Sequence, residues 1–534
     1  MRFFLLDKIT RWEVGVAAEG LKSIALSEDF FDDHFPRRPV MPGVLILEGM
    51  AQLSGLLLEE SLHQQYAKSA KAVLTVLERT KFRTLVKPGD TLLYRTEVKS
   101  VNEAGGKVKA TAFRDKTIVT STEMVFGFKY VDDPLLDEKR RHLMKLWMDA
   151  GRATTKVMRA RVVITGIGMV TPLGNNPQEI LRGIETGRSA VAPPTHFDAT
   201  PFSCPVCAEV RDFRPQPYVA EGKMIRLMNR DAQLAVVAAH LALADAGVKP
   251  GRTYEPEEIA LFGATGLAGL PLAEVIPLVK ASTGPDGQFD PGRFGQAGLR
   301  AVSPILSFKI LSNLPLCFVS ICENIQGPNS IYTPWEGQGA QAVETAIRAL
   351  ECGDAGCALA GGCDVKTHEL AFLSLEQQGL FASWQQNHAG MAPGEGAAFL
   401  VLETADRAAA RGARMYAQVS GYSLRTHQPG ASRADTCGKV FEGLNLPPEP
   451  LGAMVAADNG DVPAGEDERR ALAARQITAP TVISPKKQAG DLFAAAAGLQ
   501  IGLAALLAER GGGRVLANCF GHGSEQAAFV LEKP

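Results

Sequence analysis

The chain has 534 residues, of which 46% are apolar and 21% charged, and its formal net charge is −2. Such a length exceeds one compact core, so we expect two or three domains, and the near-neutral charge gives no electrostatic reason to expect nucleic acid or an anionic membrane as partner. Because no apolar run reaches the roughly 18 residues of a transmembrane helix, and MRFFLLDKITRW lacks the apolar core of a signal peptide, we expect a cytoplasmic protein without a membrane span.

The first 131 residues combine one long helical pattern with several strand patterns. Apolar residues recur at helical spacing over 44–62, and Pro42 suits the first turn of a helix. Four later segments alternate apolar and polar residues like half-buried strands, namely 72–78, 92–100, 106–114 and 117–130. One helix against an antiparallel sheet is an α+β layer architecture.

The segment DDHFPRRPVMPGVLILEGMAQ, at 32–52, places His34 in a proline-rich loop and Glu48 inside the predicted helix. A β-elimination needs a base for the α-proton and an acid for the departing hydroxyl. Histidine exchanges protons near neutral pH, and a carboxyl group half-buried among Leu45, Ile46 and Leu47 retains a proton that it can donate. At Gly43 the helix N-terminus offers N–H groups to a thioester oxygen, and glycine admits the substrate closely.

This segment resembles the hotdog-fold 3-hydroxyacyl-acyl-carrier-protein dehydratases with a catalytic glutamate. It matches their pattern H-F-P-x-x-P-x-M-P-G-V-L-x-x-E-x-x-A-Q at every fixed position, and RTKFRTLVKPGDTL resembles their strand and P-G-D turn. The resemblance covers about 10–130 and implies that His34 and Glu48 are catalytic. Without it, the pair reads as a structural loop histidine and a surface glutamate. Arg37 stands where the family usually has glycine, which leaves substrate preference open.

In this family the active site takes its histidine from one hotdog and its acid from another. The resemblance therefore implies that the domain self-associates or pairs with a second hotdog. The chemistry it implies needs no metal and no cofactor, since the acyl group is presented on the phosphopantetheine of an acyl carrier protein.

Residues 132–158 form a separate segment rich in charge. Five apolar side chains would share one face of a helix here, namely Leu136, Leu143, Met144, Trp147 and Met148. We interpret the segment as a helical linker that packs on one domain. An amphipathic membrane anchor is the alternative, and the mixed charge of the segment disfavours it.

Residues 159–534 alternate short, glycine-ended apolar runs with helical patterns such as 232–247. This alternation predicts a layered α/β fold with buried sheets. The glycines of TGIG, at 165–168, do not complete the G-x-G-x-x-G spacing of a dinucleotide-binding loop. Nine scattered cysteines do not make a disulfide framework. Cys204 and Cys207 lack the further ligands of a metal site, so we expect them to pack as ordinary core residues.

This second part resembles the β-ketoacyl-acyl-carrier-protein synthases of the thiolase fold. The matching segments include VVITGIGMVTPLG, LALADAG, QGPN, ALAGGCD, GEGAAFLVLE, RGAR and NCFGHGSEQAAFVLEK. Together they span nearly the full length of the part. The resemblance implies a layered α-β-α-β-α domain over 159–534.

The reactive groups of that family are missing from the matching positions. The nucleophilic cysteine follows G-P-x by seven residues, and this count leads to Glu336. Asp458, or Asn459 with a one-residue slip, replaces the first histidine, and counting five residues from Lys486 places Asp491 at the second. A carboxylate does not accept an acyl group as a thiolate does, and two aspartates would repel a developing enolate.

This pattern resembles chain-length factors, the inactive partners of heterodimeric ketosynthases. We expect Lys486 to act as a counter-ion for the buried carboxylates. We expect Glu336 to have a structural role, either accepting backbone N–H groups or pairing with Lys486. A malonyl decarboxylase is an alternative, but the decarboxylating relatives keep both histidines.

Together these patterns predict a bifunctional subunit. Its first domain would dehydrate 3-hydroxyacyl-acyl-carrier-protein to the 2-enoyl form. Its second domain would form a heterodimer with an active ketosynthase in fatty acid or polyketide synthesis. Polyene synthesis is one pathway that suits this fusion. The alternatives are a non-catalytic scaffold that binds carrier protein and ketosynthase, and an active synthase that uses Glu336. Chain length, primer, double-bond geometry and pathway stay open.

Overall fold

The computed structural model describes residues 4–25, 29–31, 34, 39–66, 68–130, 144, 147–148, 160–219, 222–267, 272–427, 432–444, 446, 450–511 and 513–534. The chain divides into two compact units, Met1–Met158 and Arg159–Pro534. The segment interpreted as a linker groups with the first unit; apart from Met144, Trp147 and Met148, it lies outside the described residues, as does Arg37. Within the described part of the chain, no helix has both the length and the apolar character needed to cross a membrane.

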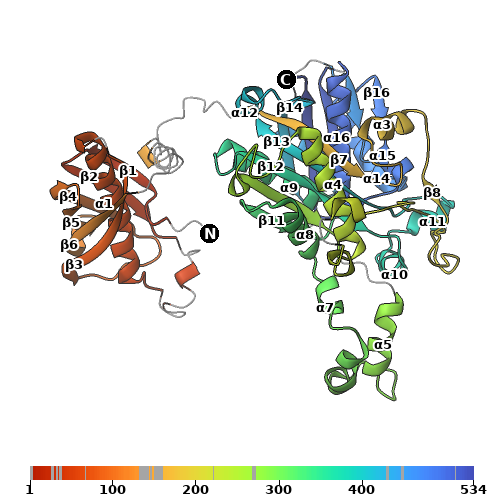
Figure 1. Ribbon diagram of the computed structural model, residues 1–534, viewed down its shortest axis with the longest axis horizontal. Coiled ribbons are helices and arrows are strands. Elements are labelled where there is room, and N and C mark those ends of the chain that lie inside the picture. The colour runs from red at the N-terminus through yellow and green to blue at the C-terminus, as the bar shows by residue number, and fades with distance from the viewer. Residues whose placement is uncertain are drawn as a thin grey trace. The chain divides into compact units, whose positions relative to one another are not determined.

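The first unit wraps a six-stranded antiparallel sheet around one long helix (Figure 1). The helix is α1 (Gly43–Tyr66), and the short turn η1 (Asp29–Phe31) precedes it. The strands are β1 (Lys8–Glu13), β2 (Ala17–Ser23), β3 (Ala70–Phe82), β4 (Thr91–Asn102), β5 (Gly105–Arg114) and β6 (Thr117–Tyr130), in the spatial order β1-β2-β4-β5-β6-β3. The predicted helix and four strands are confirmed. The sequence reasoning missed β1 and β2.

The helix and the concave sheet share one apolar core, as a hotdog fold requires. Thirteen residues of α1 are buried, including Leu53, Leu57 and Leu58, none of which is exposed to solvent. Trp147 also belongs to this core. The apolar face of the predicted linker therefore packs on the first unit, at least at Trp147.

The second unit is built on a ten-stranded sheet that consists of two five-stranded halves. The first half has the order β11-β10-β12-β13-β7 and the second β14-β18-β17-β15-β16. The strands are β7 (Val162–Val170), β10 (Ile259–Thr265), β11 (Asn329–Tyr332), β12 (Cys357–Val365), β13 (Glu395–Thr404), β14 (Ala417–Thr426), β15 (Ala453–Val455), β16 (Thr481–Ile483), β17 (Val515–Cys519) and β18 (Glu525–Glu532). Among the described residues, a short β7–β14 pairing joins the halves, at Ala417↔Ile164 and Gln418↔Val163.

Helices separate and cover the two halves, giving five layers (Figure 1). The largest apolar core lies between the halves and contains α9 (Glu336–Glu351) and α16 (Ala496–Glu509). A second core packs α4 (Arg230–Ala246) and α8 (Leu314–Glu323) on the first half, and another packs α13 (Arg433–Gly443) and α14 (Val462–Ala473) on the second half. These layers are the α-β-α-β-α arrangement of the thiolase fold, so the predicted fold class is confirmed.

Smaller elements complete the unit around this framework. Among the described residues, the remaining α-helices of four or more residues are α3 (Pro177–Glu185), α5 (Leu272–Ser282), α7 (Leu306–Lys309), α10 (Glu369–Gln377), α11 (Ala382–Asn387), α12 (Ala405–Ala410) and α15 (Pro485–Ala489). A two-stranded ribbon pairs β8 (Val191–Ala192) with β9 (Cys207–Ala208). Cys204 and Cys207 are buried free thiols in an apolar cluster with Phe372 and Phe381, which agrees with their expected packing role.

The TGIG glycines serve helix packing. Gly166 and Gly168 lie inside β7, where α4 crosses the strand. A Cβ atom at Gly168 would lie 2.0 Å from the carbonyl oxygen of Ala238, and one at Gly166 would lie 2.3 Å from that of Ala242. Such contacts are impossible for real atoms, so glycine is needed for α4 to approach β7. Both glycines thus lie within a strand, whereas a dinucleotide-binding motif places its glycines in the turn between a strand and a helix.

Candidate active site

His34 is oriented by the chain around it. Its backbone N–H donates to the Phe30 carbonyl at 3.0 Å, and its own carbonyl accepts from the Val40 N–H at 3.0 Å. Its side-chain Nδ1 lies 2.7 Å from the Val40 carbonyl oxygen. A carbonyl oxygen only accepts, so the neutral ring must carry its hydrogen on Nδ1. Nε2 is then the nitrogen that can take up a proton, as a general base must.

Glu48 lies half-buried in the first part of α1, at the start of a cleft. The cleft has a volume of about 450 Å³, runs along α1 and is bounded opposite by β3. Gln52, one turn further on, donates from Nε2 to Glu48 Oε1 at 3.0 Å. Its Oε1 accepts the backbone N–H of Leu5 at 2.9 Å, which fixes the orientation of the amide. We name this space the Glu48 cleft.

A single first unit does not bring His34 and Glu48 into one cleft. Among the described residues that line the Glu48 cleft, His34 is absent, and no hydrogen bond joins the two side chains. Gly43 stands at the start of α1, as expected, but its immediate neighbour is the ring of Phe82. A Cβ atom there would lie 2.6 Å from that ring, so glycine at this position also serves packing.

Sequence reasoning did not single out Gln52. A signal was available, because a residue four positions after Glu48 lies on the same face of a helix. The amide of Gln52 makes it a positioning group for the carboxyl.

In the second unit, Glu336 is the first residue of α9 and only 1% exposed. Both of its carboxylate oxygens lie 3.1 Å from the backbone nitrogen of His522, whose N–H donates to them. Of the two structural roles considered for Glu336, the described contacts therefore favour acceptance of a backbone N–H. A helix N-terminus also favours a negative charge at this position.

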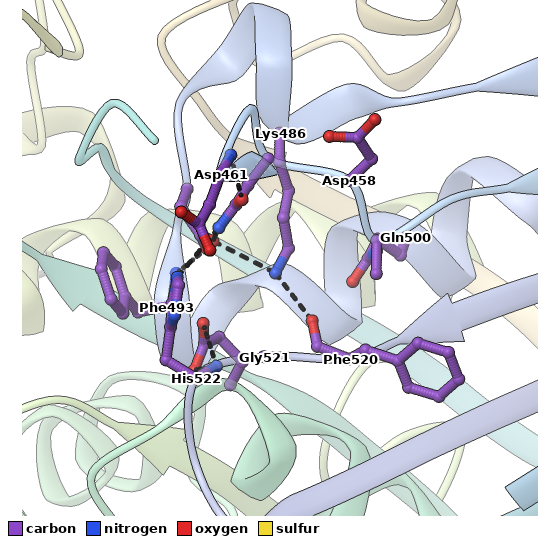
Figure 2. A network of polar contacts seen from close by, with 12 residues as sticks. Asp458, Asp461, Lys486, Phe493, Gln500, Phe520, Gly521 and His522 are labelled. Carbon is purple, nitrogen blue, oxygen red and sulfur yellow. Dashed lines mark hydrogen bonds and ion pairs between the residues drawn. The ribbon is translucent and has the colours of Figure 1, made fainter. Parts of the chain in front are cut away.

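Lys486 pairs with Asp491 (Figure 2). The lysine Nζ lies 3.2 Å from Asp491 Oδ2 and donates to the Phe520 carbonyl at 3.0 Å, and both charged side chains are at most 1% exposed. Burial alone would raise the pKa of Asp491, but the charge of Lys486, with contributions from His522, Asn459 and the Phe493 N–H, lowers it. The expected counter-ion role of Lys486 is thus observed for Asp491.

Of the two residues considered for the first histidine position, Asp458 lies outside this cluster. It accepts from Lys487 Nζ at 2.7 Å, lies 3.8 Å from Arg469, and points to one side of the network (Figure 2). Asn459 occupies the inner position instead, 5% exposed and donating to Asp491 Oδ2 at 2.8 Å. The physical reason is solvation: Asp458 keeps two exposed cationic partners, whereas an uncharged amide is less costly to bury beside Asp491.

His522 is a member of the cluster that sequence reasoning missed. Asn459 Oδ1 accepts the N–H of Asp461 at 3.0 Å, so its Nδ2 hydrogens point to Asp491 and to His522 Nε2, the latter at 3.0 Å. His522 Nε2 therefore accepts, and the neutral ring carries its hydrogen on Nδ1. The available signal was a histidine between two glycines directly after a buried strand, in NCFGHG.

These side chains also raise the question of a metal ion. Ligating atoms of Glu336, Asp491 and His522 lie within 4.8 Å of one another. However, Lys486 already neutralises Asp491, and His522 Nε2 is engaged by Asn459. We therefore assign no metal to this cluster.

Comparison with known proteins places the first unit. Residues 1–126 match the family model described as "FabA-like domain". The 3-hydroxyacyl-[acyl-carrier-protein] dehydratase FabZ of Caldicellulosiruptor saccharolyticus is 39% identical over 127 residues, which are 24% of this chain and 89% of that protein. The chain thus belongs, through its N-terminal domain, to the FabZ-type dehydratase family.

The second unit is similar to β-ketoacyl synthases. Residues 159–408 match the model "Beta-ketoacyl synthase, N-terminal domain". The 3-oxoacyl-[acyl-carrier-protein] synthase 2 of Coxiella burnetii is 29% identical over 364 residues, 64% of this chain and 84% of that protein. The tetracenomycin polyketide synthase ketoacyl synthase beta subunit of Streptomyces glaucescens is 29% identical over 366 residues, 65% of this chain and 85% of that protein.

Among solved structures, "The ishigamide ketosynthase/chain length factor" has a TM-score of 0.60 and 23% sequence identity; the match covers 70% of this chain and 100% of that one. At this identity the likeness supports the fold. The chain therefore fuses a FabZ-type hotdog dehydratase domain to a ketosynthase-like domain of the thiolase fold.

Proposed function

We propose that the first domain dehydrates 3-hydroxyacyl groups, carried on an acyl carrier protein, to 2-enoyl groups. The observation that carries this proposal is that hydrogen bonds orient both His34 and Glu48. The Val40 carbonyl accepts from His34 Nδ1, which makes Nε2 the basic nitrogen of the neutral ring, and Gln52 donates to Glu48 in its cleft. General acid–base elimination needs no redox or metal cofactor. We place the reaction in the cytoplasm.

The complete site forms, in this proposal, between two hotdog domains. Strand β3 supports it, because β3 is an edge strand thirteen residues long, paired on one side with β6. Several of its apolar side chains are exposed, including Val73 (49%), Val76 (46%) and Phe82 (53%). A long edge with exposed apolar groups invites pairing with a second edge. Such pairing would bring His34 of one copy to the Glu48 cleft of the other.

The direct test is an assay of the purified full chain with 3-hydroxyacyl-carrier protein, followed by the absorbance of the enoyl thioester and by mass loss of one water. Formation of the 2-enoyl product supports the proposal. Absence of product for every chain length offered would contradict it and favour the non-catalytic scaffold.

We further propose that the second domain does not catalyse condensation. Glu336 fills the start of α9, where the resemblance places the nucleophilic cysteine, and its carboxylate holds the N–H of His522. Asn459 and Asp491 stand at the positions of the two histidines and bind one another. A negative carboxylate in the pocket repels an enolate, and the cation that would offset it, Lys486, is already paired.

The expected result is that the chain alone neither loads an acyl group on residues 159–534 nor releases carbon dioxide from malonyl-carrier protein. Intact-mass and peptide mass spectrometry after incubation with acyl-carrier protein measures the first, and trapped labelled carbon dioxide the second. A ketosynthase with an intact cysteine serves as the positive control. Glu336→Cys should load acyl groups at most, without condensation, because Asn459 and Asp491 replace the histidines. An acyl adduct on the wild-type second domain would show that the site is active.

We propose a separate, active ketosynthase as the partner of the second domain, as in chain-length factors. An extension that carries α5 and α7 projects from the layered body (Figure 1). Its surface and the neighbouring α8 expose several large apolar side chains: Val279, Phe289, Leu299, Ile310, Leu311 and Ile321. We name this set the apolar extension. Exposed apolar groups in such number favour a protein interface. We expect this interface to bury about 2,000 Å² or more, the size typical of permanent complexes.

Co-expression with each ketosynthase of the same genome should give a stable one-to-one complex on size-exclusion chromatography. Val279→Asp with Ile310→Asp should weaken that complex by about 10-fold or more, because the two charges would be buried at the interface. Val482→Asp, on β16 of the same domain, is the matched control, exposed to a similar degree and expected to leave ketosynthase binding unchanged. If the double variant binds as tightly as the control, the apolar extension is not the interface.

A further inference from the structure

One wall of the Glu48 cleft comes from outside the hotdog sheet and helix. Phe4, before β1, and Trp147, after β6, both line the cleft. Their rings meet edge to face, with centroids 5.3 Å apart and planes at 89°. Trp147 is 9% exposed and packs with the core of the first unit. We name these two side chains the aromatic wall.

The cleft has the form of a channel for an extended apolar group. It runs along α1 from Glu48 to Glu59, eleven residues or roughly 16 Å along the helix axis. Its middle is lined mainly by apolar groups, among them Leu56, Leu74 and Phe126. At the far end Glu59 is 4% exposed and accepts the backbone N–H of Ala72 at 3.0 Å.

The aromatic wall is also connected to the catalytic carboxyl. Leu5, next to Phe4, donates its N–H to Gln52, and Gln52 donates to Glu48. The segment that forms part of the wall therefore also helps to hold Glu48. The match to the FabA-like model ends at residue 126, so Trp147 is contributed by a segment beyond the matched family domain.

We propose that Trp147 and Phe4 determine specificity in the dehydratase site, by limiting the length of the acyl chain that the Glu48 cleft accepts. This inference rests on the proposed dehydratase function and names the part of its substrate that the wall recognises. The ligand class is the apolar tail of a 3-hydroxyacyl thioester. Because the wall is apolar, it contacts methylene groups and leaves the thioester end to His34 and Glu48.

The test compares kcat/KM for long and short 3-hydroxyacyl groups on the same carrier protein, using the full chain. Trp147→Ala opens the wall and should raise the long-to-short ratio by about 10-fold or more, since contacts in apolar pockets discriminate by roughly 10- to 200-fold per methylene. Gly55→Ala should do the opposite and lower the ratio severalfold. The added methyl at position 55 lies in the cleft lining, and its nearest neighbours are 3.7 Å away, so it fits without a clash.

Trp12→Ala is the matched control, because Trp12 packs on the same core but does not line the cleft. Its ratio of kcat/KM for long to short acyl groups should equal that of the wild type. Wild-type ratios in both Trp147→Ala and Gly55→Ala would overturn the inference. If Trp147→Ala proves insoluble, Trp147→Leu and Gly55→Ala decide the question in the same way. Absence of dehydration by the wild-type chain would instead overturn the proposed function, so the two failures are distinguishable.

Discussion

Replacing His34 or Glu48 should each lower the rate of dehydration by about 10²-fold or more, the usual loss when a general acid or base is removed. His34→Ala removes the nitrogen that takes the α-proton. Glu48→Gln keeps the size of the side chain but removes the proton that the departing hydroxyl needs. The measurements are kcat at saturating concentrations, and kcat/KM at limiting concentrations, of the 3-hydroxyacyl-acyl-carrier protein.

Matched controls lie on the same helix. His63→Ala and Glu60→Ala change residues of the same types on α1, away from the cleft, and should leave the rate within about twofold. If active sites form between two copies, mixing inactive His34→Ala and Glu48→Gln chains should restore part of the activity, because a mixed dimer contains one site with both groups. Wild-type rates in both single variants would refute their assignment. Two inactive variants that regain nothing on mixing would refute only the shared-site arrangement.

Local sequence patterns were informative where periodicity was strong. The apolar spacing over 44–62 predicted α1, and the alternation after it predicted four strands within a few residues. Strand β2 was missed because Ala17, Ala18 and Gly20 give a weak strand signal. Its place in the sheet is set by pairing with β4, a long-range contact that no local pattern contains, and β1 joins the sheet through its pairing with β2.

In the second domain, a site position was easiest to predict where the chain is in regular secondary structure. Glu336 was located by counting from Gly327 through the short strand β11, and α9 begins at that residue. Asp458 and Asn459 lie in a loop, where a one-residue slip changes which side chain faces inward. His522 was missed because the resemblance gave no reason to expect a histidine there. The three-dimensional contacts with Glu336 and Asn459 place it in the cluster.

The buried Lys486–Asp491 pair leads to the second large expected effect. Lys486→Met should lower the unfolding free energy of the second domain by about 3–5 kcal/mol at neutral pH, because it leaves a buried aspartate without its cation. Lys487→Met is the matched control on the adjacent residue. Lys487 is 46% exposed and pairs with Asp458 at the surface, so its loss should cost only about 0–1 kcal/mol. Thermal and denaturant unfolding, followed by a probe in the second domain, measures both.

The pH dependence of this loss of unfolding free energy distinguishes an unpaired buried charge from a simple packing defect. In the wild type the pKa of Asp491 is lowered, so its ion pair stabilises the fold above the ordinary aspartate pKa, and that stability is lost as pH falls through the lowered value. In Lys486→Met, burial without a cation should raise the pKa of Asp491. The penalty should therefore be largest at neutral pH and shrink as acid protonates Asp491. Adding Asp491→Asn to Lys486→Met should recover much of the loss, since the buried charge is gone. Equal destabilisation by Lys486→Met and Lys487→Met, independent of pH, would mean that Asp491 does not depend on Lys486 for its charge.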